Sequence, residues 1–422
     1  MSDEQWIDNL PSTWTMARLG ALGQLSKGSG GSKEDNRDTG VAVVRYGELY
    51  GKFDRVIRQA QSFVSPEDAS RYTPLPTGSL VFAGSGEDPE EIGKSALSLL
   101  PSPAFVGGDS IIFSPRTDVV DPLYLTYVLD SQPLRAYKAV RSTGFTVVHI
   151  NAGKLKTLPI PLPLLDEQRA IADYLDHETA QIDALVAKQE EFIGLLRERR
   201  AAAIDKTITA IVASQIPLRR ALRYLTSGSR GWGAFYSNEG ERFLRIGNLS
   251  RGNLSLRGNV QNVRLPESVT EGARTRLRRR DLLFSITAYI GSVAVVDDPD
   301  WVDGYVSQHV ALSRLDESRL DPHYVGWVML STAGQDQLKQ GAAGGTKVQL
   351  ALDDIRELVV PAPPVEEQIE IALYLNEQTS RIDTLIAKAE EHIALAKERR
   401  SALITAAVTG QTDVRTAAQK AS

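Results

Sequence analysis

The chain has 422 residues, of which 42% are hydrophobic, and a formal net charge of −5. This length is typical of two to three domains, and the apolar content is enough for buried cores. Because there is no cysteine and the five His residues are scattered, disulfides and Cys-based metal sites are excluded and a metal cluster is disfavoured. The N-terminus is acidic without an apolar stretch, and no run of 18 apolar residues occurs, so we expect a cytoplasmic protein.

Residues 1–157 are rich in Gly, Pro and β-branched residues in short alternating runs, so we expect a mixed α/β domain with many short strands. Within it, the stretch VFAGSGEDPEEIGKSA at residues 81–96 is similar to two catalytic loops at once. Gly84-Ser85-Gly86 follows an apolar run, as in a cofactor-binding loop. Gly93-Lys94-Ser95 matches the end of a phosphate-binding P-loop.

The sequence supports neither a phosphate-binding P-loop nor a methyltransferase site at this stretch. A P-loop has four residues between its first Gly and its Gly-Lys-Ser/Thr, because the backbone must wrap phosphate oxygens. Six residues separate Gly86 from Gly93. An amino-methyltransferase would need an Asn/Asp-Pro-Pro-aromatic sequence to hold its target nitrogen, and the chain contains none, nor any HExxH or GxSxG motif. We therefore expect a strand, a loop and a strand at residues 81–96.

A long helix is predicted within residues 158–213. Pro161 and Pro163 stop the preceding strand. Acidic residues then fill the first turn and Arg residues the last third, which suits the helix dipole. The apolar spacing is heptad-like but imperfect and predicts a helix of roughly 45 residues packed lengthwise on a partner. Its apolar positions are Ile171, Leu175, Ile182, Leu185, Phe192 and Leu196.

Residues 214–357 are expected to form a second mixed α/β domain that is faintly related to the first. VVRYGELYG from Val43 parallels FLRIGNLSR from Phe243, and DLLFSITAYIGSVAVV from Asp281 parallels the stretch at residues 81–96 without its Gly84, Gly86 or Lys94. The two related halves keep the strand patterns but differ in the loop between them. This difference indicates loops that recognise different targets rather than a catalytic site common to both halves. The first 60 residues are neutral, whereas residues 216–280 hold 14 Arg and 4 acidic residues.

Residues 358–413 repeat residues 158–213 at an offset of 200 without a gap, and a short tail follows at residues 414–422. About half of the positions are identical between 158–204 and 358–404. The second copy keeps Ile371, Leu375, Ile382 and Leu385 and continues with His392 and Ala396. The repeat predicts an α+β chain in which two mixed α/β domains alternate with two long helices. We expect these helices to pair as an antiparallel coiled coil about a pseudo-twofold axis.

Several of these segments resemble the specificity subunits of type I restriction–modification enzymes. They are LAKERRSALITAAVTGQTDV from Leu395, the lead-ins LPIPLPLLDEQRAIADYLD and LVVPAPPVEEQIEIALYLN, RIGNL from Arg245 and GSLVFAGSGEDPEEIGKSA from Gly78. The resemblance covers nearly the whole chain. It implies a non-catalytic subunit with two target recognition domains, each reading one half of a split site in double-stranded DNA, and helices that set the gap between the half-sites.

The resemblance also implies partners and cofactors. The helices would dock two modification (methyltransferase) subunits that carry S-adenosylmethionine and methylate adenine. Two restriction subunits that use ATP and Mg²⁺ can join them. No cofactor is expected in this chain.

The candidate DNA contacts are basic, amide or aromatic residues in segments that we expect to be exposed loops or strand ends. The loops SKGSGGSK from Ser26 and TSGSRGWG from Thr226 suit phosphate approach, and a Trp can stack or wedge. An Arg can reach guanine edges and a Gln can address adenine. A plain surface loop or an internal salt bridge is the alternative for each. The set is Lys27, Lys33, Arg45, Lys94, His149, Arg230, Trp232, Arg245, Arg274, Arg276, Arg278, Arg279, Arg280, Lys347 and Gln349.

Subunit docking is expected on the outer faces of the two long helices, where ordinary solvated charge is the alternative. The predicted docking residues recur at the offset of 200 and are Glu167, Gln168, Glu198, Arg199, Arg200, Glu367, Gln368, Glu398, Arg399 and Arg400.

Two other functions are left open by the residues alone. A fused methyltransferase or nuclease with an unrecognised site would turn over substrate by itself. A duplicated coiled-coil scaffold without DNA binding fits the acidic net charge, which is not typical of nucleic-acid-binding proteins, but not the Arg-rich second domain.

Overall fold

The computed structural model describes residues 6–414 apart from 267, 271 and 343–348. It divides into two compact units, one of residues 1–189 with 391–422 and one of residues 190–390. Each unit holds a mixed α/β domain and part of both long helices. None of the helices in this described part is long and apolar enough to cross a membrane.

The first α/β domain is built around a five-stranded sheet in the order β2-β11-β7-β9-β4 and a four-stranded sheet in the order β5-β3-β10-β6. Two short pairs, β1-β13 and β8-β12, complete it. The strands are β1 (Thr15–Arg18), β2 (Gly23–Lys27), β3 (Val41–Val44), β4 (Val56–Ile57), β5 (Ser62–Val64), β6 (Thr73–Pro74), β7 (Leu80–Ala83), β8 (Ser85–Gly86), β9 (Ser95–Ser98), β10 (Ala104–Val106), β11 (Ser110–Pro115), β12 (Val148–His149) and β13 (Pro159–Leu162).

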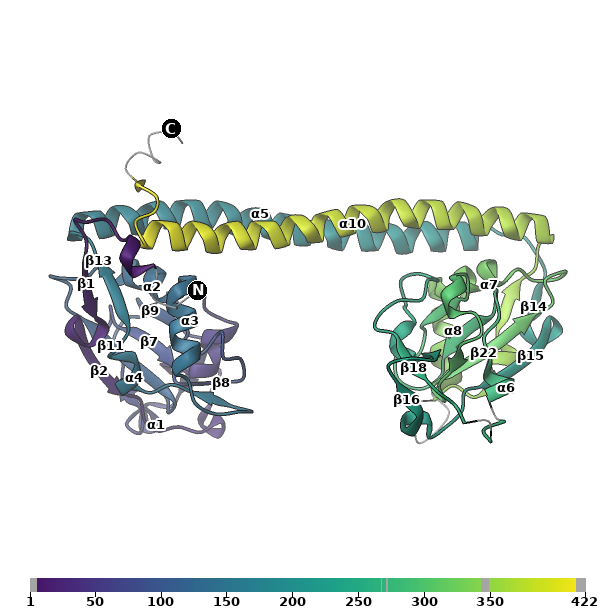
Figure 1. The fold of residues 1–422 in the computed structure, drawn as a ribbon, viewed down its shortest axis with the longest axis horizontal. Helices are drawn as coiled ribbons and strands as arrows, with labels where there is room; N and C mark the ends of the chain where they lie inside the picture. The colour runs from purple at the N-terminus through teal and green to yellow at the C-terminus, as the bar shows by residue number, and fades with distance from the viewer. Residues whose placement is uncertain (1–5, 267, 271, 343–348, 415–422) are drawn as a thin grey trace. The chain divides into compact units, whose positions relative to one another are not determined.

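The helices α2 (Pro122–Asp130) and α3 (Gln132–Arg141) join this sheet to the long helices (Figure 1). Asp121 caps α2 by accepting a hydrogen bond from the Tyr124 amide at 2.9 Å, and Pro122 occupies the first turn, where a missing N–H costs nothing. Their apolar side chains share one core with β7, β11 and residues of both long helices. The short helices α1 (Pro66–Ala69) and α4 (Ala152–Leu155) lie in the connections.

The second α/β domain has two four-stranded sheets, in the orders β15-β22-β19-β20 and β16-β18-β17-β21, and the pair β14-β23. Its strands are β14 (Gln215–Pro217), β15 (Leu222–Ser227), β16 (Tyr236–Ser237), β17 (Glu241–Leu244), β18 (Gln261–Val263), β19 (Leu282–Ser285), β20 (Val293–Val295), β21 (Tyr305–Val306), β22 (Val310–Leu315) and β23 (Val359–Pro361). Its helices are α6 (Gly272–Thr275), α7 (Pro322–Leu330), α8 (Thr332–Ala342) and α9 (Leu352–Glu357).

Local contacts of the first domain recur in the second at the same sequence offset. Asp321 caps α7 through the Tyr324 amide at 2.9 Å, as Asp121 caps α2. The Tyr324 hydroxyl donates to the Pro361 carbonyl at 2.9 Å, as the Tyr124 hydroxyl does to Pro161 at 3.0 Å. The prediction of two mixed α/β domains is thus confirmed, and the related sequence segments form related local structure.

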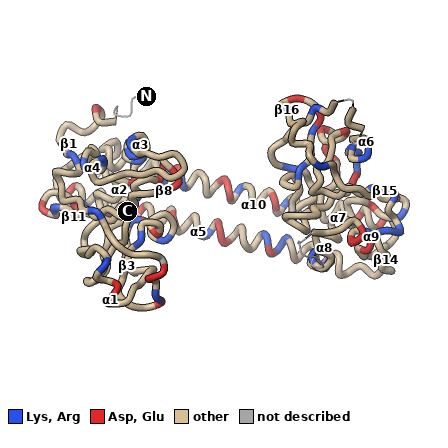
Figure 2. Tube along the Cα trace, turned by 90° about the horizontal axis from the view of Figure 1, so that it is seen from below, with Lys and Arg blue, Asp and Glu red and all other residues tan. Residues whose placement is uncertain are grey.

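The two predicted long helices are α5 (Leu165–Thr209), of 45 residues, and α10 (Val365–Val408), of 44 residues. Acidic and basic residues are interspersed along both (Figure 2). The predicted apolar seam is right at Ile171, Leu175, Ile182, Leu196, Leu375 and Ile382, which are buried. It is wrong at Leu185, Phe192 and Leu385, which are exposed, because the imperfect heptads turn these positions outward and Ile193 is buried instead of Phe192.

Residues 81–96 form the expected strand, loop and strand. The buried strand β7 leads through the two-residue β8 and a turn to β9, which pairs antiparallel with β7. β8 pairs with β12, so the loop is held to the segment that carries His149.

Candidate nucleic-acid interface

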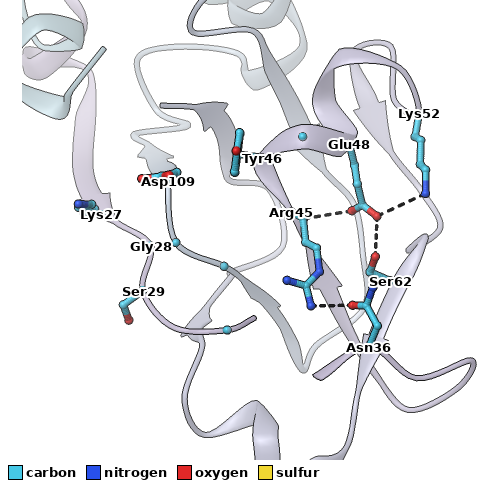
Figure 3. A pocket seen from close by; sticks show the side chains of 14 residues that line it. Lys27, Gly28, Ser29, Asn36, Arg45, Tyr46, Glu48, Lys52, Ser62 and Asp109 are labelled. Atoms are coloured by element: carbon cyan, nitrogen blue, oxygen red, sulfur yellow. Dashed lines mark hydrogen bonds and ion pairs between the residues drawn. The ribbon is translucent and has the colours of Figure 1, made fainter. Parts of the chain in front are cut away.

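A hollow of about 840 Å³ in the first α/β domain contains two of the predicted DNA contacts. It is lined by the end of β2, the start of the 3-10 helix η4 (Tyr46–Tyr50) and the turn at residues 107–109. Lys27 and Arg45 both line it (Figure 3). Because β2 is an edge strand, Lys27 at its end is exposed.

Two further hollows share lining residues with the first and extend it. One of about 720 Å³ shares Tyr46 and is also lined by Lys94. The other, of about 360 Å³, shares Lys27 and is also lined by His149. Four segments that are distant in the sequence therefore place their predicted DNA contacts around one concave surface, which we call the first-domain hollow.

The polar groups of the first-domain hollow suit base edges as well as phosphates. The exposed ring of His149 lies with its Nδ1 2.9 Å from the Ser85 Oγ. Lys94 lies with its Nζ 3.4 Å from Glu91, and Glu87 and Asp88 also line the surface. Cations donate to guanine, and carboxylates accept from the amino groups of cytosine, so this mixture can discriminate bases.

Hydroxyl groups beneath the hollow are tied to the backbone or to carboxylates. Burial raises the pKa of Tyr50, and its hydroxyl donates to the Ser85 carbonyl at 2.9 Å. The Ser32 amide lowers the pKa of the Asp35 carboxyl, which also accepts a hydrogen bond from the Tyr72 hydroxyl at 3.0 Å. The bond from Tyr72 to Asp35 ties the loop at residues 28–36 to the domain.

Arg45, predicted to reach a guanine edge, is half-buried in the wall of the hollow and bonds to neighbouring groups. Its Nη2 donates to the Ser32 carbonyl at 2.9 Å and to Asn36 Oδ1 at 2.6 Å. Its amide donates to Glu48, which closes the first turn of η4 (Figure 3). The structure therefore gives Arg45 a positioning role in the wall of the hollow, which corrects the prediction of a free reading group.

One matched glycine in each of the two loops is required by close packing. At Gly28 a Cβ would collide with the Gly107 carbonyl, and at Gly228 it would collide with the Val306 and Ser307 carbonyls. Any other residue would push each loop away from the neighbouring turn. Lys33 lies in the 3-10 helix η3 (Lys33–Asp35), and its side chain is outside the described part of the structure.

Trp232, predicted to stack on or wedge into DNA, is buried. It begins the 3-10 helix η6 (Trp232–Phe235) and is only 3% exposed. Its ring packs 5.7 Å from that of Phe243 and edge-on to Tyr305 at 5.2 Å between centroids. Because it forms the centre of this small core, the prediction is wrong for this structure. The neighbouring Arg230 is exposed, as a phosphate contact requires.

Arg245 matches Arg45 in position but differs in its contacts. It precedes the 3-10 helix η7 (Ile246–Asn248), whose Asn248 Oδ1 accepts its amide at 2.9 Å. Its half-buried guanidinium has no hydrogen-bond or ion-pair partner within the described ranges, so it remains the more available member of the pair. Gln349 is exposed, and Lys347 lies outside the described residues.

Of the five arginines in residues 274–280, three bond to other residues of the domain and two are exposed to solvent with guanidinium groups that have no partner among the described residues. The Arg274 guanidinium donates to the Thr226 hydroxyl at 2.7 Å, and Arg276 pairs with Asp303 at 3.4 Å. Arg280 pairs with Glu317 and Asp321. Arg278 and Arg279 are exposed, and their guanidinium groups make no hydrogen bond or ion pair to any described residue. Of the five predicted phosphate contacts, these two are the ones that the fold leaves available.

The predicted docking residues separate into outward and inward positions. Glu198, Arg199, Glu367, Glu398 and Arg399 are exposed, and Glu167 is half-buried with a hydrogen bond from the Trp14 indole at 3.3 Å. Gln168 and Gln368 are fully buried, which corrects their assignment to an outer face. Arg200 is buried and Arg400 is half-buried, and both pair with carboxylates of the other long helix.

Two exposed aromatic residues were missed by the sequence analysis. Phe145, in the loop before β12, is fully exposed, and Tyr289, in the loop after β19, is 67% exposed. Tyr289 has a φ of 57°, in the left-handed region that non-glycine residues rarely adopt. A sequence signal existed, because both aromatics lie in loops between a glycine and a β-strand pattern.

The described residues contain no group of three or more His, Cys, Asp or Glu side chains placed to hold a metal ion. The first-domain hollow carries charged side chains of both signs.

Comparison with known proteins identifies the family. The family model described as the type I restriction modification DNA specificity domain matches residues 11–192 and 267–394, which is more than half of the chain. The chain belongs to this family. Its role is DNA sequence recognition in a type I restriction–modification system.

Relatives match along nearly the whole chain. The specificity subunit of the type I restriction enzyme EcoKI from Escherichia coli strain K12 is 24% identical over 436 residues, which covers 95% of this chain and 90% of the relative. The putative specificity subunit of the type I enzyme MjaX from Methanocaldococcus jannaschii is 23% identical and covers 97% of this chain and 96% of the relative.

Solved structures share the fold. A chain from a structural study of complex assembly and conformational transition in the type I system matches with a TM-score of 0.73 at 17% identity, covering 96% of this chain and 99% of that one. The HsdS subunit from Thermoanaerobacter tengcongensis matches with a TM-score of 0.51 at 18% identity, covering 96% and 98%.

Proposed function

We propose that this specificity protein reads a bipartite site in double-stranded DNA, with one half-site bound by each target recognition domain, residues 1–157 and 214–357. The first-domain hollow supports the first half-site contact, through Lys27, Lys94 and His149. Arg230, Arg245, Arg278 and Arg279 support the second, because their guanidinium groups are available to phosphates and guanine edges.

We further propose that residues 158–213 and 358–413 form spacer helices that pair antiparallel about a pseudo-twofold axis. In the first unit the Arg400 Nε lies 2.9 Å from Asp183 Oδ1, and in the second the Arg200 Nε lies 3.0 Å from Asp383 Oδ1. The two pairs exchange the roles of the helices at the offset of 200. This reciprocity is the observation that carries the proposal, because parallel helices cannot make the same contact twice with their roles exchanged.

The exposed faces of the helices are proposed to dock two modification subunits. The helices also expose several large apolar side chains, which is typical of a surface that binds a protein partner. The exposed charged residues of the predicted docking set are Glu198, Arg199, Glu367, Glu398 and Arg399. The exposed apolar residues are Leu185, Phe192, Leu195, Ile369, Leu373, Tyr374, Leu385 and Leu395.

In this proposal the chain is a non-catalytic, cytoplasmic subunit. S-adenosylmethionine would be carried by the modification subunits, and ATP and Mg²⁺ would serve two restriction subunits that can join. The tail at residues 414–422 has no assigned role.

The test is to co-express the chain with a modification subunit and to sequence the host DNA for methylated adenines. A single motif with two fixed half-sites and a gap of constant length supports the proposal. Replacing residues 1–157 with the corresponding domain of another specificity subunit should change one half-site only. If an assembled, cofactor-loaded complex produces no motif, the chain does not read DNA and the duplicated scaffold is the better account.

A further inference from the structure

Arg400 in the first unit and Arg200 in the second occupy matching positions of the repeat, so their surroundings can be compared. Arg400 lies beside two carboxylates, because its Nε is 2.9 Å from Asp183 Oδ1 and its Nη2 is 3.3 Å from Asp54. Arg200 pairs through its Nε with Asp383, but its buried Nη2 has no hydrogen-bond partner among the described residues. Arg200 is only 8% exposed, so solvent reaches it poorly.

The surroundings of the two arginines differ in the size of the pocket and in the number of carboxylates that reach the guanidinium group. The pocket at Arg400 measures about 120 Å³ and is lined by Asp54, Glu91 and Asp130 together with five basic residues, Arg55, Lys94, Arg135, Lys138 and Arg400. The pocket at Arg200 measures about 550 Å³, and Leu330 occupies the position that matches Asp130. We call this larger pocket the arginine pocket; it is lined by Arg197, Arg200, Arg251, Arg257, Asp383 and Glu390.

Four guanidinium groups against two carboxylates leave the arginine pocket with an excess of positive charge. One carboxylate is used by Arg200 and the other by Arg197, whose Nη2 lies 3.5 Å from Glu390. Arg257 donates to the Ser250 hydroxyl, and Arg251 is exposed without an ion pair to any described residue. A buried guanidinium that lacks one partner is costly, and an anion that accepts its hydrogen bond removes that cost.

The pocket is joined to the segment that carries a proposed base contact. Asn248, in the 3-10 helix that Arg245 begins, donates to the Arg257 carbonyl at 2.8 Å. The loop of Arg251 and Arg257 is therefore hydrogen-bonded to that helix. A ligand in the pocket and a base beside Arg245 would contact one connected segment.

We propose that the arginine pocket binds a phosphate group of the DNA backbone. The inference rests on the proposed DNA-reading function. The planar forks of several arginines match the oxygens of a phosphate, and the pocket is wider than one carboxylate needs. The corresponding pocket of the first unit has only about 120 Å³, and its carboxylates already pair with Arg55, Arg135 and Arg400, so we expect it to bind no phosphate.

The test compares the full chain with the double variant R251Q/R257Q, bound to its modification subunit and to a duplex that carries the methylated motif. Both arginines are exposed, so the Arg200–Asp383 pair stays intact. The matched control is R319Q/R356Q, which removes two exposed arginines of the same domain, each paired three residues away. Both variants lower the charge by two.

Each lost phosphate contact should reduce the slope of log K against log salt concentration by about 0.9, which corresponds to about fivefold in affinity at 0.15 M salt. R251Q/R257Q should show this reduction with specific and nonspecific duplexes alike, and R319Q/R356Q should not. An unchanged slope in R251Q/R257Q, with wild-type binding intact, overturns the inference alone. If the wild type itself binds no DNA, the proposed function fails first.

Two other anion sources give different results. If inorganic phosphate raises the melting temperature of the wild type but not of R251Q/R257Q, and the DNA slope is unchanged, the pocket binds a free oxyanion. If the variant instead loses assembly with the modification subunit at an unchanged slope, the pocket binds an acidic protein segment. Either result overturns the assignment to DNA.

Discussion

The buried amide of Gln168 provides a decisive test of how the long helix is anchored to the first domain. Its Oε1 accepts the Asp121 amide at 2.8 Å, and its Nε2 donates to the carbonyls of Val119 at 3.1 Å and Pro163 at 2.9 Å. Gln368 makes the same three bonds in the second unit, to Asp321, Arg319 and Pro363, at 2.8 to 2.9 Å. The substitution Gln168→Ala removes the partner of three main-chain groups at once.

The expected magnitude follows from those three groups. A buried donor or acceptor that loses its partner costs about 1–3 kcal/mol. At the lower end of that range, Gln168→Ala should reduce the free energy of unfolding of the first unit by about 3 kcal/mol. For a unit of this size that corresponds to a fall of about 6–12 °C in Tm.

Hydrogen–deuterium exchange of the full chain measures this effect unit by unit. In Gln168→Ala the amides of α2 and of the first turns of α5 should exchange faster, and those of the second unit should not change. Gln181, exposed on the same helix, is the matched control, and Gln181→Ala should leave exchange unaltered. Unchanged exchange in Gln168→Ala together with lost assembly with the modification subunit would refute the anchoring argument and restore Gln168 as a docking residue.

Three further predictions address DNA contact, spacing and pH. Lys27→Gln should lower the salt slope of DNA binding by about 0.9 for every duplex; a change confined to one sequence would contradict a phosphate contact. Inserting four helical residues after both position 191 and position 391, midway between the reciprocal ion pairs, adds about 6 Å and should lengthen the methylated gap by one or two base pairs; an unchanged gap would exclude the helices as spacers. Burial lowers the pKa of Lys138 from 10.5 to about 8. Between these two pH values the Lys138 amine is protonated in the unfolded chain but not in the folded chain. The free energy of unfolding of the first unit should therefore rise by about 2 kcal/mol from pH 8 to 9.5. Urea unfolding should show that Lys138→Met abolishes the rise, whereas Lys188→Met, at an exposed lysine, retains it.

The periodicity of the sequence was sufficient to predict the two long helices and the alternation with α/β domains. Proline before each helix, acidic residues in its first turn and the gapless offset of 200 are local signals, and the helices begin at Leu165 and Val365 as those signals indicate. The exclusion of a P-loop also needed only spacing, because the number of residues between glycines limits how a backbone can wrap phosphate.

Only the tertiary structure decided which of the matched polar and aromatic residues face solvent. The Arg45 guanidinium is held in the wall of the first-domain hollow because Ser32 and Asn36 accept its hydrogen bonds. Trp232 is buried because Phe243 and Tyr305 pack against its ring. Exposure depends on neighbours that are far away in the sequence, and no local pattern records them. Arg200 and Arg400 each end an identical Glu-Arg-Arg triplet, yet the folded chain places a second carboxylate, Asp54, beside Arg400 only, because the loops that meet them come from the two divergent domains.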